Sequence, residues 1–276
     1  MEASTFRLVW APGLIGMTIG FALYGASIAQ YLFYIRFFRN DRHILKFVVS
    51  IVFMFDTVHT AITGRFYWRM LVLCRQITSY ECSFALPWEL SVTMIITCLV
   101  AFCVQCFYAH RVWIMSARNK PLICLVLIFA CAQLVFGMLF AADGYSTQNV
   151  TVLFNNWFCS VTSLASAICD LIITISAFIY LRPLRHSAIR KVHYIQQFNF
   201  IFMQMGLVTS ITSLMVTIFY SQFHTSVVYL ASAPTMMLSK AYTNSMLAVL
   251  NARKSIRDRE RANPSAVELP TLPLIR

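Results

Sequence analysis

The chain has 276 residues, of which 59% are hydrophobic and only 12% are charged, and its formal net charge is +12. Soluble domains carry about 25% charged residues, so this composition excludes an ordinary soluble domain and indicates a membrane protein. The positive charge does not indicate nucleic-acid binding, because the basic residues flank hydrophobic segments instead of forming one stripe with interleaved aromatic side chains. Contact with anionic lipid on the cytoplasmic side explains the charge more simply.

Seven hydrophobic segments follow one another along the chain, each close to the roughly 20 residues that cross a hydrocarbon core of about 30 Å. They cover about residues 13–35, 44–64, 87–109, 121–141, 157–180, 197–220 and 226–250. Continuous apolar runs favour helices over barrel strands. The sequence therefore predicts an all-α polytopic bundle of seven transmembrane helices over residues 1–257, with a disordered cytoplasmic tail over 258–276. The first segment is too long for the core of a cleavable signal peptide, so we expect it to act as its own insertion signal.

The distribution of basic residues predicts the orientation of the bundle. If the N-terminus lies outside and the C-terminus in the cytoplasm, most of the 22 Lys and Arg residues fall on the cytoplasmic side. The outer side keeps Arg7, Arg65, Arg69 and Arg75. Asn149 begins an Asn-Val-Thr sequon in the loop after the fourth segment, which this orientation places outside, so it is a candidate glycosylation site. We expect a multi-pass protein of the plasma membrane or another secretory-pathway membrane.

The nine cysteines do not predict a disulfide framework, because most of them fall within the hydrophobic segments, where free cysteines pack as small apolar residues. In the predicted orientation, Cys74, Cys82 and Cys159 lie on or near the outer side, where disulfide bonds can form. Sidedness alone leaves one bridge conceivable, between Cys82 and Cys159.

Three ionisable residues fall near the middle of their segments: Asp56, Asp170 and Lys240. A charge at that depth costs about 2.5–3.5 kcal/mol on insertion scales, so it needs a partner or a water-filled cavity. We predict a polar centre in the bundle interior, in which Lys240 pairs with one or both aspartates. His59 follows Asp56 by one helical turn, and Asn244 follows Lys240 by one turn, so both are candidate members of this centre.

Two interpretations of this polar centre stay open. A buried ion pair with its hydrogen bonds can fix the register of helices without binding anything. The same groups can instead line a ligand pocket, or form a switch whose protonation changes helix packing. Glu89, beside Trp88 at the outer end of the third segment, is interpreted as an interfacial carboxylate in preference to a pocket wall.

The backbone of two segments carries further signals. Gly16 and Gly20 form a GxxxG spacing that permits close helix approach. Pro234 removes one backbone hydrogen bond, so we expect a kink in the seventh segment, six residues before Lys240.

Several short motifs resemble a large fungal family of seven-helix membrane proteins known only by a domain of unknown function. They are DTVHT (56–60), PWELSV (87–92), AHRVWIMS (109–116), ASAICDLIIT (165–174) and KAYTNSMLAVLNAR (240–253). The resemblance covers about residues 13–257. It implies the seven-helix fold and membership of Asp56, His59, Asp170, Lys240 and Asn244 in the family pattern, and it implies no activity, ligand or catalytic residue.

Three classes of function compare poorly with the sequence. A retinal pigment would use a lysine such as Lys240, but Met236 stands where microbial rhodopsins carry an aspartate. A seven-helix metal hydrolase needs several His and Asp ligands at one depth, whereas His59 is the only histidine of the sequence that lies well inside a hydrophobic segment. Coupling to G proteins lacks its usual motifs, since the third segment ends in Ala-His-Arg at Arg111.

The sequence therefore predicts an integral membrane protein of unknown activity, most consistent with a receptor-like or small-ligand-binding bundle. We expect no enzyme activity, catalytic residue, metal or cofactor. The expected partners are the lipid bilayer, a small-molecule ligand and a cytoplasmic protein, and not nucleic acid. The alternative is a transporter, or a structural membrane protein whose buried charges only fix helix packing.

Overall fold

The computed structural model describes residues 3–74, 87–147, 156–181, 190–222 and 226–262, and the described chain is all-α. The long helices are α1 (Ala3–Phe37), α2 (His43–Trp68), α5 (Trp88–Met115), α6 (Lys120–Thr147), α8 (Trp157–Leu181), α9 (Arg190–Tyr220) and α10 (Ser232–Ala262). A short π-helix, η1 (Arg69–Leu73), continues α2, and a 3₁₀-helix, η3 (Ser226–Ala231), precedes α10. Each of the seven predicted segments thus overlaps one long helix.

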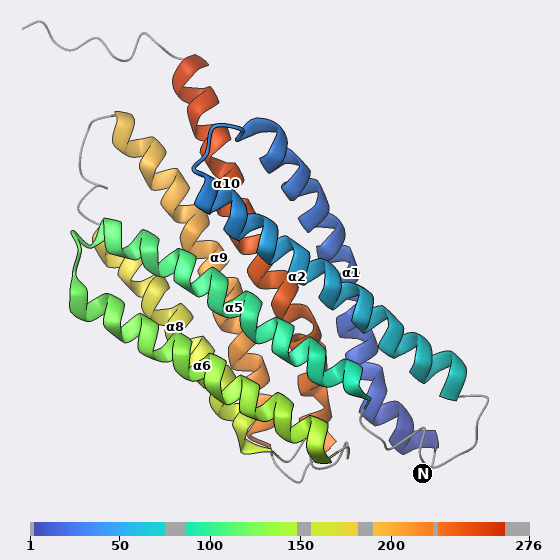
Figure 1. Ribbon diagram of the computed structural model, residues 1–276. Coiled ribbons are helices and arrows are strands. Elements are labelled where there is room, and N and C mark those ends of the chain that lie inside the picture. Colours follow the sequence, from blue (N-terminus) through green and yellow to red (C-terminus); the bar gives the residue numbers. More distant parts are fainter. Residues whose placement is uncertain (1–2, 75–86, 148–155, 182–189, 223–225, 263–276) are drawn as a thin grey trace, which may run out of the picture.

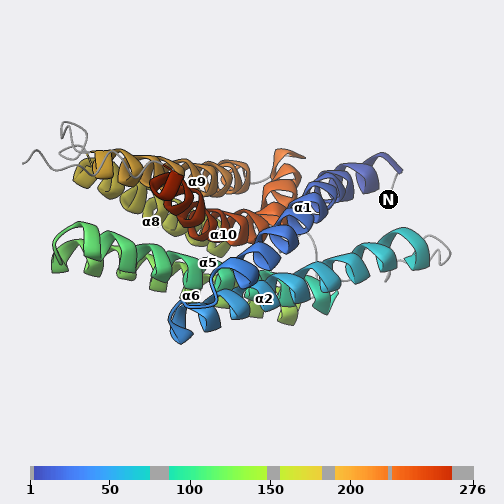
Figure 2. The ribbon, with the colours of Figure 1, turned by 90° about the horizontal axis from the view of Figure 1, so that it is seen from above.

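Consecutive helices run in opposite directions, so the start of α1 and the end of α10 lie at opposite ends of the bundle (Figure 1). Seen from above, α8, α9 and α10 form one layer and α2, α5 and α6 form another, with α1 crossing obliquely beside α10 and α2 (Figure 2). Helix α10 packs against α1, α2, α5 and α9 and is the central element of the bundle. A polar side chain on α10 therefore meets another helix on almost every side.

Within the described residues, five helices are long and apolar enough to cross a membrane: α1, α2, α5, α6 and α8. Helix α9 offers a shorter apolar stretch, Gly206–Tyr220. Helix α10 carries polar residues along its length, and its neighbours bury those of its middle turns, Ser239, Lys240, Thr243 and Ser245. Because a helix enclosed by other helices needs no apolar exterior, composition alone identifies α6, at the bundle edge, more readily than α10.

The apolar core lies along the facing surfaces of α5 and α10. Val104 and Tyr108 of α5 and Met246 and Leu247 of α10 are all buried there. This core continues toward α2 through Val49 and Val52. The half of the bundle that holds the end of α5 and the middle of α10 is thus packed with side chains.

Small residues bring α1 close to α10. A Cβ added at Gly16 would lie 2.3 Å from the backbone oxygen of Ala233, whereas Gly20 lies opposite Lys240 with its added Cβ 3.8 Å from that side chain's Cγ. Pro234 occupies the first turn of α10, where backbone N–H groups have no partner within the helix and the missing donor costs little. The proline thus lies at the helix start and not at an interior kink.

Candidate functional site

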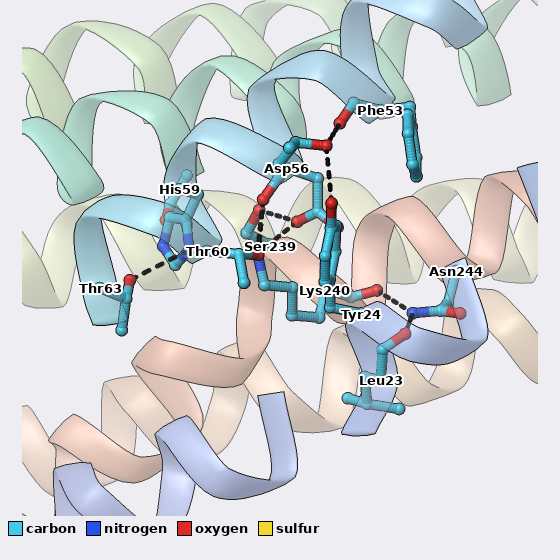
Figure 3. Close-up of polar contacts among 12 residues, drawn as sticks. Leu23, Tyr24, Phe53, Asp56, His59, Thr60, Thr63, Ser239, Lys240 and Asn244 are labelled. Atoms are coloured by element: carbon cyan, nitrogen blue, oxygen red, sulfur yellow. Dashed lines mark hydrogen bonds and ion pairs between the residues drawn. The ribbon is translucent and has the colours of Figure 1, made fainter. Parts of the chain in front are cut away.

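Lys240 and Asp56 form a buried ion pair between α10 and α2. The Lys240 Nζ lies 2.7 Å from Asp56 Oδ1, and the two side chains are 2% and 0% exposed. The same ammonium donates to the backbone oxygen of Asp56 at 2.9 Å (Figure 3). Ser239, the residue before the lysine, donates its hydroxyl to Asp56 Oδ1 at 3.0 Å. Two adjacent residues of α10 therefore hold one carboxylate of α2.

His59 completes the contacts of the ammonium. Its Nδ1 lies 3.2 Å from Lys240 Nζ and 3.4 Å from the hydroxyl of Thr63. A protonated lysine can only donate, so Nδ1 accepts, and a neutral imidazole then carries its proton on Nε2. The ammonium has three N–H donors, and Asp56 Oδ1, the Asp56 backbone oxygen and His59 Nδ1 provide three acceptors.

Helix α1 covers this ion pair from the other side. The Tyr24 ring lies 5.6 Å from Lys240 Nζ, within cation–π range. Asn244 donates to the backbone oxygens of Leu23 and Lys240, each at 2.9 Å, and accepts a hydrogen bond of 3.2 Å from Gln30. Asn244 thus ties α1 to α10 one turn beyond the lysine.

Asp170 belongs to a separate network on the opposite side of α10. Its Oδ2 accepts from the hydroxyl of Tyr242 at 2.7 Å, and its Oδ1 accepts from Gln105 Nε2 at 3.1 Å. Ser166, one turn earlier on α8, lies 2.7 Å from the Tyr242 hydroxyl. Because Lys240 and Tyr242 are two residues apart on a helix, they point to different sides of α10. Of the two aspartates, Lys240 therefore contacts Asp56, whereas Asp170 contacts neutral donors.

Glu89 lies at the start of α5, between two arginines of α2 and η1. Its oxygens are 3.3 Å from Arg65 Nε and 3.9 Å from an Arg69 nitrogen. The glutamate side chain is 1% exposed, whereas those of the arginines are 69% and 45% exposed. Arg65 also stacks over the Trp88 ring at 5.4 Å. Glu89 is thus an enclosed carboxylate whose partners are two exposed arginines, and its position at the membrane interface stays a prediction.

The cysteines contradict the bridge that sidedness left open. Cys159 is a buried free thiol, so it forms no disulfide with Cys82. Cys74 is disulfide-bonded. The prediction is wrong because it rested on sidedness, which does not report which thiols approach one another. Cys82 and the sequon residue Asn149 lie outside the described residues.

The sequence did not single out Tyr242, Gln105, Ser239 or Tyr24 as site residues. Tyrosine and glutamine carry no charge, so their cost in a hydrophobic segment is small and they do not stand out there. A usable signal was nevertheless present for two of them. Tyr242 lies inside the motif KAYTNSMLAVLNAR (240–253), and Ser239 directly precedes it. Among the residues described, no group of three or more His, Cys, Asp or Glu side chains is placed to hold a metal ion.

Comparison with known proteins finds a family match in the second half of the chain. A sequence model of a protein family described as a family of unknown function, DUF6534, matches residues 166–255. This segment runs from α8 to α10 and includes Asp170, Lys240 and Asn244, while Asp56 and His59 precede it. No curated protein and no solved structure matches the chain. Over residues 166–255, the chain is therefore similar to a protein family whose function is unknown.

Proposed function

We propose that this protein is a receptor-like membrane protein with seven spans, an outer N-terminus and a cytoplasmic C-terminus. Five helices already have the length and composition of membrane spans, and α9 and α10 continue their antiparallel order (Figure 1). The start of α1 and the end of α10 lie at opposite ends, as an odd number of crossings requires. The distribution of basic residues supports the orientation. The fungal seven-helix family that the motifs resemble fits this arrangement.

The observation that carries the receptor-like role is the ion pair between Asp56 and Lys240. It joins α2 to the central helix at a depth where either charge alone is unfavourable. Asp56 Oδ2 is buried and accepts no hydrogen bond from the described residues. A small polar ligand could donate a hydrogen bond to that unsatisfied oxygen and would compete with Lys240 for the carboxylate. Such competition favours a second arrangement of α2 and α10 in the manner of a two-state receptor.

A structural role is the second candidate, and the saturation of the ammonium favours it. All three Lys240 N–H groups have an acceptor within 3.2 Å. A fully satisfied buried pair fixes which faces of two helices meet, without any ligand. In this case the pair sets register, and its replacement by apolar side chains of similar volume leaves the bundle unchanged.

Hydrogen–deuterium exchange in lipid nanodiscs separates the two roles. The double variant Asp56→Leu, Lys240→Met removes both charges together and leaves no unpaired ion. A two-state receptor loses the contact that holds one state, so the folded double variant exchanges backbone amides of α2 and α10 at least about tenfold faster, a bias of about 1.4 kcal/mol. A structural pair predicts exchange equal to the wild-type protein. Ser239→Ala keeps the ion pair and is the matched control.

A further inference from the structure

Asp170 is a buried carboxylate without a cation among the described residues. It is 2% exposed, and none of the ion pairs within that part of the chain includes it. Its partners Tyr242 and Gln105 both donate to it from neutral groups. Thr209 is a third neutral hydrogen-bond partner of the carboxylate. A carboxylate offers about four acceptor positions, so capacity for a further ligand remains. The negative charge in the bundle interior therefore still needs compensation.

Oxygen-bearing side chains continue from Asp170 along the contact between α8 and α9. Toward one end, Thr217 donates to Ser163 at 2.9 Å. Toward the other end, a Cβ added at Gly206 would lie 2.5 Å from the hydroxyl oxygen of Thr174. These two contacts fix an antiparallel register in which residue numbers on α8 and α9 add to the same total. In that register, Asp170 faces Ser210, and the preceding residue, Thr209, hydrogen-bonds to the Asp170 carboxylate.

Several oxygens of this contact have no partner within the described residues. The Ser213 hydroxyl, the Thr174 hydroxyl and Gln105 Oε1 are buried and make no hydrogen bond there. Ser213 and Gln105 are fully buried, and Thr174 is 7% exposed. In the register above, Ser213 lies one residue before the position opposite Ser166, and Thr174 follows Asp170 by one turn of α8. Unsatisfied oxygens thus gather on both sides of an uncompensated carboxylate.

We propose that Asp170 and the surrounding oxygens, which we call the α8–α9 oxygen site (Gln105, Ser166, Asp170, Thr174, Thr209 and Ser213), bind a monovalent alkali cation. Carboxylate, hydroxyl and amide oxygens are the ligands of hard cations. One carboxylate balances one positive charge, so Na⁺ leaves the site neutral, whereas a divalent ion would leave a buried excess charge. The site lies on the other side of α10 from Lys240 and is independent of the receptor-like role proposed above.

Thermal unfolding of the purified full chain in detergent tests this site, with NaCl compared against choline chloride at equal ionic strength. Choline is too large for a site made by packed helices, so it controls for ionic strength. We expect a saturable increase of about 3–6 °C in Tm with Na⁺, the size that tenfold excess over Kd gives for a domain of this length. Asp170→Asn abolishes the increase.

A milder pair of variants keeps the test decisive if Asp170→Asn does not fold. Ser213→Ala removes one proposed ligand and weakens the apparent Na⁺ affinity about tenfold. Thr212→Ala removes an exposed hydroxyl that donates to Val208 within α9, and leaves the affinity unchanged. Equal Tm values in Na⁺ and choline, or an increase that survives in Asp170→Asn, would overturn the proposal. A Tm that depends on pH but not on Na⁺ would show a proton as the occupant and would overturn it too.

Discussion

Two buried aspartates on opposite sides of α10 are held in different ways. Asp56 meets a cation, the ammonium of Lys240 at 2.7 Å. Asp170 meets the neutral donors of Tyr242 and Gln105 at 2.7 and 3.1 Å. The distances are similar, but among the described residues only the first carboxylate has its charge balanced by a side chain. The comparison teaches that equal depth in a membrane bundle does not imply a shared partner, because one central helix presents different residues to each neighbour.

The largest effect is expected at the charged side of the comparison. Lys240→Met leaves Asp56 buried and unpaired, which costs about 3–5 kcal/mol of unfolding free energy. The double variant Asp56→Leu, Lys240→Met recovers most of that loss, since no charge is left without a partner. Denaturant unfolding in mixed micelles measures both. A single variant as stable as the wild-type protein would contradict the ion pair.

The neutral side of the comparison predicts a smaller loss. Tyr242→Phe deprives Asp170 and Ser166 of one buried hydroxyl, while the Gln105 donor stays. We expect a cost of about 1–3 kcal/mol in the same unfolding measurement. Tyr31→Phe, which removes an exposed contact with Ser50, is the control and costs less than about 0.5 kcal/mol. Equal losses in the two variants would mean that the Asp170 network is not closed in the native protein.

Alanine substitutions at glycines test how closely the helices on each side of α10 pack. Gly16→Ala places its Cβ against the backbone of Ala233, which cannot move without shifting α10, so we expect a loss of about 1–3 kcal/mol. Gly206→Ala meets only the side-chain hydroxyl of Thr174, which can rotate, and costs less. Gly25→Ala has nothing within 4 Å and is neutral or stabilising through helix propensity. Thermal unfolding of the three variants should rank them in that order, and the reverse order would contradict the close approach of α1.

Asn244 gives a smaller effect than Lys240, Tyr242 or Gly16. Asn244→Ala removes hydrogen bonds to Leu23 and Gln30 of α1 at a partly buried position, and about 1 kcal/mol is the expected loss. The measurement is the same unfolding curve. Gln30→Ala removes the partner that donates to Asn244, so the two losses are less than additive if the contact forms. Fully additive losses would show that Asn244 and Gln30 do not form this hydrogen bond.

The helical architecture could be predicted from the sequence because the length of each hydrophobic segment can be read directly from its residues. The sequence also predicted that Lys240 pairs with one or both aspartates, since opposite charges at one depth have few other ways to be stabilised. It did not resolve Asp170 from that pair, because depth does not report which side of a helix a residue faces. Tyr242 and Gln105 escaped notice because an uncharged polar residue in a segment costs too little to require a partner.

Double-mutant cycles on unfolding free energy test the separation of the two centres most directly. One cycle combines Lys240→Met with Asp56→Leu, and the other combines Lys240→Met with Asp170→Asn. The structure predicts a coupling above about 2 kcal/mol in the first cycle and below about 0.5 kcal/mol in the second, because only the first pair is in contact. A coupling with Asp170 as large as that with Asp56 would contradict two separate centres on opposite sides of α10.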